Sequence, residues 1–137
     1  KHQLSYFHGG MSMLMYPKEY LDFSHLVKQY VILHIMLKVL EFDRKMIQQS
    51  ACKLTRVYQD TLFEVQKKIE KDLRSIKRQM KELGGMVIEE EQQRTVRIVK
   101  AKFRGFIYTH RFLNYMLQAE SEQLFKSYVS QGDDQKK

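Results

Sequence analysis

The sequence predicts a mainly α-helical fold: a three-helix antiparallel bundle with a small β-hairpin between the second and third helices. Two observations lead to this fold class. Only one proline and six glycines occur among 137 residues, and their scarcity favours long helices over a turn-rich β protein. In addition, apolar residues recur every three or four positions over two long segments, which is the period of a helix face.

The first helix is expected to begin near Pro17, because proline favours the first helical turn. Apolar residues recur at helical spacing over residues 26–40, and Val31, Ile35 and Val39 lie beside them. A helix that is apolar around most of its surface is either central in the fold or part of an oligomer interface. We therefore expect a homodimer that forms through Val31, Ile35 and Val39.

The second helix has the most regular period in the chain. Nine apolar residues between Leu54 and Leu83 are separated by steps of three or four, as one face of a helix requires. The remaining positions between Lys53 and Glu82 carry nine basic and five acidic residues. Two glycines follow at 84–85 and are expected to end this helix.

The pattern then changes to short β-branched runs at residues 86–88 and 95–99, separated by a polar segment at 89–93. This arrangement predicts a β-hairpin, and a helix that continues from residue 89 is the alternative. Gly105 is expected to end the second strand. A third helix is expected from about residue 108 to 129, with an inward-facing set of Phe112, Leu113, Met116, Leu117, Leu124 and Tyr128.

The expected organisation is a flexible leader at residues 1–16, one helical domain at 17–130 and a disordered polar tail at 131–137. Residues 1–10 are either an artificial expression leader or native sequence. Cys52 is the only cysteine, so no intrachain disulfide can form and a reducing, cytoplasmic setting is expected. The richest apolar run, residues 31–42, is shorter than the ~20 residues of a membrane span, so no membrane span is expected.

The most informative segment is residues 92–119, which contains six basic residues and no Asp or Glu, in a chain of net charge +8. On a strand, Lys100, Lys102 and Arg104 would point to one face at ~6.6 Å intervals, close to the spacing of successive phosphates. We therefore expect a non-enzymatic binding module for an anionic partner, above all nucleic acid, with an acidic protein as the alternative. The candidate contact residues are Arg97, Lys100, Lys102, Arg104, Tyr108, His110 and Arg111.

Two other interpretations stay open. The acidic segment 89–91 could fold back and neutralise Arg94 and Arg97 near the turn, leaving Lys102 and Arg104 free. The function could also be that of a protein-interaction or regulatory module, acting through the apolar surface of the first helix.

Local motifs give no support for an enzyme. The sequence has no phosphate-binding glycine loop, no nucleophile elbow and no zinc-protease helix, so no catalytic residue and no cofactor is expected. Asp22-x-x-His25 occurs once, whereas carboxylate-bridged metal sites in bundles need such a motif from two helices, so no metal is expected. An enzyme would be favoured if the structure placed Cys52 or His110 in a closed pocket with a carboxylate.

Short patterns at residues 40–45 (LEFDRK), 71–73 (KDL), 76–80 (IKRQM), 105 and 112–114 (FLN) resemble those of the YhjD-like proteins, a small family of helical proteins from Gram-positive spore formers. The resemblance covers roughly residues 31–129. It implies the order helix, helix, hairpin, helix. It brings no activity, cofactor or site residue that could be transferred to this chain.

Overall fold

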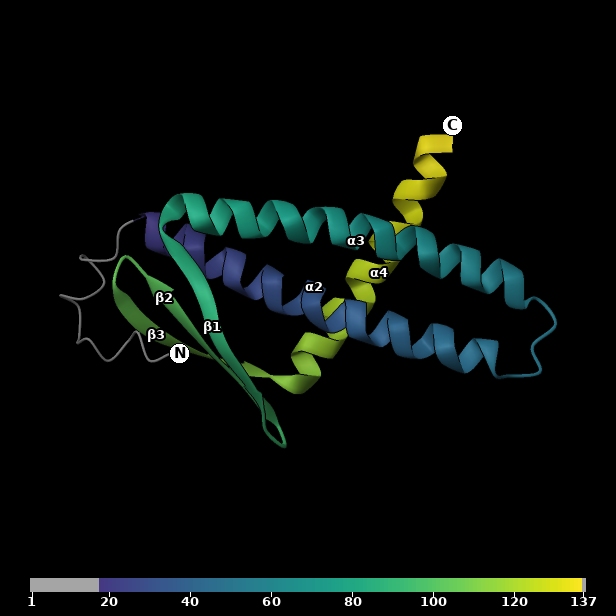
Figure 1. Ribbon diagram of the computed structural model, residues 1–137, viewed down its shortest axis with the longest axis horizontal. Coiled ribbons are helices and arrows are strands. Elements are labelled where there is room, and N and C mark those ends of the chain that lie inside the picture. The colour runs from purple at the N-terminus through teal and green to yellow at the C-terminus, as the bar shows by residue number, and fades with distance from the viewer. Residues whose placement is uncertain (1–17, 137) are drawn as a thin grey trace.

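The computed structural model describes residues 18–136, and the side chains of residues 18–131. The elements in chain order are α2 (Lys18–Gln48), α3 (Thr55–Leu83), β1 (Gly85–Gln92), β2 (Val96–Phe103), β3 (Phe106–Leu113) and α4 (Asn114–Lys136). The long helices α2 and α3 lie antiparallel, the sheet lies at one end of this pair, and α4 crosses the pair obliquely (Figure 1). The leader predicted for residues 1–16 lies outside the described residues, and α4 continues through most of the predicted tail.

The predicted three-helix antiparallel bundle with a small hairpin is wrong. Residues 18–136 form three helices and a three-stranded antiparallel sheet in the order β1-β2-β3. The third helix begins at Asn114, six residues after the position expected from the sequence. It crosses the α2–α3 pair and does not run alongside it (Figure 1).

Residues 106–113 form a third strand, β3, where the sequence predicts the start of the third helix. Its side chains alternate between core and solvent, which is the period of a strand: Tyr108, His110 and Phe112 face inward, and Ile107, Thr109, Arg111 and Leu113 face outward. Arg104 and Gly105 connect β2 to β3 and have φ angles of 51° and 89°. Two consecutive positive φ angles are typical of a two-residue hairpin turn. Gly105 therefore turns the chain back along β2 and does not lead it into a helix.

Most of the core comes from α2. Nine of its residues are buried, and Phe23, Val27 and Val31 have no solvent exposure. The stripe predicted on α3 is confirmed from Val65 to Met80, where residues at helical spacing are buried against α2, whereas its first members, Leu54 and Tyr58, are exposed. By length and composition α2 could also cross a membrane, but a core helix has the same composition, and here nine of its residues are buried in the core while Leu21, Val39, Phe42 and Met46 are exposed.

An aromatic cluster joins the sheet to the start of α2. The ring of Phe23 stacks on that of Phe103 with 4.9 Å between centroids, and Tyr20 contacts Phe103 and Tyr108 at 5.6 and 4.6 Å. Gly85 lies directly beneath this cluster. A Cβ atom at Gly85 would overlap the Phe23 ring and lie 2.8 Å from the carbonyl oxygen of Lys102. Only glycine therefore allows α2 and β2 to approach this closely.

Replacement of Gly85 by alanine is expected to lower the free energy of unfolding by about 1–3 kcal/mol, because the added methyl group must displace Phe23 or β2. Gly105→Asn is the matched control. A side chain at Gly105 meets no atom within 4 Å, and asparagine tolerates a positive φ. Urea unfolding followed by circular dichroism measures both variants; Gly105→Asn reports the cost of backbone strain at a positive φ without overlap, and unchanged stability in Gly85→Ala would contradict the packing argument.

Candidate functional site

The outer face of the sheet carries three of the predicted cations. Lys100 and Lys102 on β2 and Arg111 on β3 are exposed. Across the β2–β3 ladder their register partners are uncharged: Lys102 lies opposite Ile107, Lys100 opposite Thr109, and Arg111 opposite Ile98. Each of the three cations is therefore next to an apolar or hydroxyl side chain across the β2–β3 ladder.

A second set of cations forms a ridge along the exposed side of α3. Its members follow one another at steps of four, three, four and three residues, and so share one helix face: Lys67, Lys71, Arg74, Arg78 and Lys81. The two acids within this stretch are engaged elsewhere. Glu70 accepts a hydrogen bond from Gln66 at 3.2 Å, and Asp72 accepts one from the Tyr128 hydroxyl at 2.6 Å. We call this set the α3 ridge.

Most of these cations have no carboxylate beside them. Among the side chains of residues 18–131, one cation of the α3 ridge forms an ion pair: Lys67 with Glu64 at 3.1 Å. None of the three sheet cations forms one among these side chains. Glu89 on β1 is the register neighbour of Lys100 but is not within ion-pair distance. The positive charge of both sets is therefore left to solvent and to any partner.

Arg104 lies between the sheet cations and the α3 ridge. Its backbone N–H donates to the carbonyl of Gly84 at 2.9 Å, and its Nε donates to the carbonyl of Leu83 at 3.3 Å. The guanidinium also lies 4.9 Å from the centroid of the Phe103 ring. Arg104 is thus fixed at the end of α3, two residues after Lys102.

Arg97 belongs to the opposite face of the sheet. Its Nη1 lies 3.1 Å from Glu90, its Nη2 donates to Gln92 at 2.8 Å, and its side chain is 16% exposed. Glu90 also lies 3.5 Å from Nδ1 of His34 on α2, and burial together with Glu90 raises the pKa of the neighbouring Tyr30. The pairing of Arg97 with the acidic segment is confirmed, and it links β1, β2 and α2.

Tyr108 and His110 also face inward. The Tyr108 ring packs on Tyr20. His110 is 8% exposed, and its Nε2 lies 3.5 Å from the hydroxyl of Ser24. Strand alternation puts Arg111 on the face opposite to both, so these two predicted contact residues and Arg111 cannot meet the same ligand.

The predicted interface residues on α2 have different surroundings. Val31 is fully buried in the core, Ile35 is half-buried, and Val39 is 49% exposed. Ile35 and Val39 line a cleft of about 670 Å³ between α2, α4 and the β1–β2 end of the sheet. Cys52 is exposed in the loop between α2 and α3. Within residues 18–131 no three His, Cys, Asp or Glu side chains are grouped to hold a metal ion.

A family model described as "YhjD protein" matches residues 19–133, which is most of the chain. The chain belongs to the YhjD family. The match confirms the resemblance in the short sequence patterns and extends it to the N-terminal half of α2. No curated protein and no solved structure matches the chain.

Replacement of His110 by glutamine is expected to reduce the pH dependence of stability. Burial lowers the pKa of His110 below its ordinary value of 6.5, so as the pH falls the unfolded chain binds a proton that the folded chain does not. The free energy of unfolding should therefore fall as the pH drops through the ordinary value of 6.5, and less steeply in His110→Gln. Urea unfolding at several pH values tests this, and parallel curves for the two proteins would contradict it.

Proposed function

We propose that this YhjD-family protein is a non-enzymatic binding module for nucleic acid. Its contacts would be made by Lys100, Lys102 and Arg111 on the outer face of the sheet, with Arg104 and the α3 ridge. The observation that carries the proposal is that these cations are exposed and, apart from Lys67, have no carboxylate within ion-pair distance among the described side chains. Unpaired surface cations in a chain of net charge +8 favour an anionic partner.

The spacing of the cations suits a phosphate backbone. Successive members of the α3 ridge rise by about 5–6 Å along the helix axis, because each step is three or four residues. Lysine and arginine at such intervals can each neutralise a phosphate and release its condensed counterions, which is the main source of sequence-independent affinity for nucleic acid. Arg97, Tyr108 and His110 have no part in the proposed contact, since they face inward.

The proposal predicts a strong dependence of affinity on salt, which a triple variant should weaken. Loss of three phosphate contacts in Lys100→Ala/Lys102→Ala/Arg111→Ala should lower the slope of log K against log salt by about 2–3. Lys38→Ala/Lys45→Ala/Lys53→Ala is the matched control, because it removes three exposed cations from the other end of the molecule. Fluorescence anisotropy with labelled DNA and RNA at several salt concentrations gives both slopes. Equal slopes for the two triple variants, or no binding by the unaltered protein, would overturn the proposal.

A second candidate function is protein interaction through the exposed apolar end of α2. Val39, Phe42 and Met46 are 49%, 61% and 48% exposed on this helix. Neighbouring exposed apolar side chains of this size are typical of an interaction surface. In the predicted homodimer, a second copy of the chain would cover this surface.

The double variant Val39→Glu/Phe42→Glu is expected to shift the protein from dimer to monomer while leaving its circular dichroism spectrum unchanged. Both side chains are exposed, so the charges would oppose association without disturbing the core. Light scattering after gel filtration measures the mass. The same mass for the variant and the unaltered protein would exclude a dimer through this surface.

A further inference from the structure

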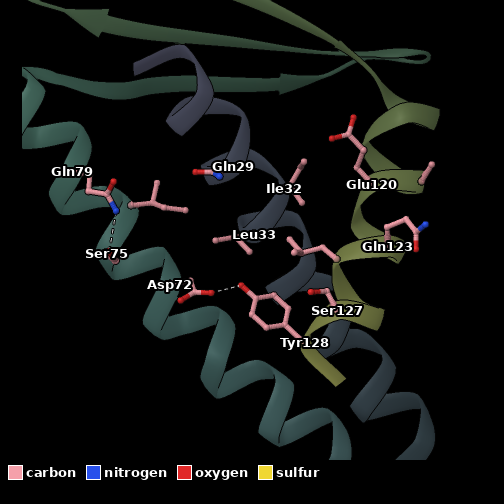
Figure 2. A pocket seen from close by; sticks show the side chains of 13 residues that line it. Gln29, Ile32, Leu33, Asp72, Ser75, Gln79, Glu120, Gln123, Ser127 and Tyr128 are labelled. Atoms are coloured by element: carbon pink, nitrogen blue, oxygen red, sulfur yellow. Dashed lines mark hydrogen bonds between the residues drawn. The ribbon is translucent and has the colours of Figure 1, made fainter. Parts of the chain in front are cut away.

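A cleft of about 760 Å³ lies where α4 crosses the α2–α3 pair. Figure 2 shows the side chains of all three helices around it. Its apolar part is formed by Ile32 and Leu33 of α2 and Ile76 of α3, which are 6%, 3% and 8% exposed. Glutamines from α2, α3 and α4 line it as well. The cleft thus combines a buried hydrocarbon surface with side-chain amides, a combination typical of small-molecule sites.

The charge of the cleft is opposite to that of the chain. No Lys, Arg or His is among its lining residues, which include the carboxylates of Asp72 and Glu120. Glu120 is paired with Lys28 at 3.0 Å, whereas Asp72 has no cation within ion-pair distance among the described side chains. Lys68, one turn earlier on α3, instead donates to the backbone carbonyl of Tyr128 at 3.0 Å.

Asp72 is exposed, and its carboxylate is held in position by one part-buried hydrogen bond. Tyr128 is 3% exposed, and its ring reaches from α4 to α3, where its hydroxyl donates to Oδ2 of Asp72 at 2.6 Å (Figure 2). Burial and the hydrogen bond to Asp72 raise the pKa of the phenol, so it stays a proton donor. The other oxygen, Oδ1, has no hydrogen-bond partner among the described side chains. Asp72 is therefore an oriented acceptor with one oxygen open to a ligand.

We propose that this cleft binds an aliphatic ammonium ligand, an alkylamine or a polyamine. The ammonium group donates to Oδ1 of Asp72, forming a charge-assisted hydrogen bond with a carboxylate that is already oriented. The hydrocarbon chain lies on Ile32, Leu33 and Ile76, where its burial is favourable. The amide oxygens of Gln29 and Gln123 accept remaining N–H groups. The negative cleft disfavours anionic molecules of the same length.

The inference is tested by isothermal titration of nucleic-acid-free full chain with n-hexylamine and with spermidine, and with hexanoate as the control of opposite charge. Binding of either amine without binding of hexanoate supports the proposal, and the preferred amine distinguishes an alkylamine site from a polyamine site. Failure of both amines to bind, or equal binding of hexanoate, overturns it.

A pair of matched variants tests whether the ammonium meets Asp72. Asp72→Asn keeps an oxygen that can accept from Tyr128 but removes the charge, so amine binding should become about tenfold weaker or worse. Asp60→Asn removes the same charge from another exposed position of α3, outside the cleft, and should bind the amine as tightly as the unaltered protein does. If the two variants bind the amine equally, a site at Asp72 is excluded. Because neither variant changes the sheet cations or the α3 ridge, failure here leaves the nucleic-acid proposal unaffected.

Discussion

The packing of Phe23 against Phe103 over Gly85 is the contact on which the rest of the structure depends. It holds the first turns of α2 against the inner face of the sheet, at a separation that a side chain at position 85 would not allow. Once this face of β2 is buried, strand alternation determines the direction of the other side chains of β2 and β3, whereas in β1 the register shifts between Val87 and Glu89. A shift of one residue in register would bury Lys100 and Lys102 and expose Val99 and Phe103.

The packing of Phe23 against Phe103 also explains how charge is distributed over the two faces of the sheet. On the inner face, Arg97 and Glu90 are paired and bonded to their neighbours, because an isolated buried charge would be unfavourable. On the outer face, Lys100, Lys102 and Arg111 need no such partner, since water solvates them. The sheet thus carries a structural ion pair on its inner face and three exposed cations on its outer face.

The direction of α4 follows from the point where it leaves the sheet. Its first residue, Asn114, donates from its backbone N–H to the carbonyl of Thr95 and from its side chain to the carbonyls of Gln93 and Arg94. These three bonds attach the helix to the β1–β2 turn, so α4 starts beyond the edge of the helical pair and crosses it (Figure 1). The crossing leaves the cleft between the three helices, and it brings Tyr128 to Asp72. A helix parallel to α2 would have filled this space.

Local patterns in the sequence were sufficient to predict the helices α2 and α3 and the residue at which α3 ends. Helix periodicity and the glycines after α3 are properties of neighbouring residues. Local patterns were also sufficient to predict that Lys100 and Lys102 share an exposed strand face. The third strand was not predicted, since Phe112, Leu113, Met116 and Leu117 have helical spacing, although they belong to β3 and α4. The inward direction of Arg97 and His110, and the cleft at Asp72, depended on packing between segments far apart in the chain. Those contacts, and not any local pattern, decided which polar residues were buried and which could meet a ligand.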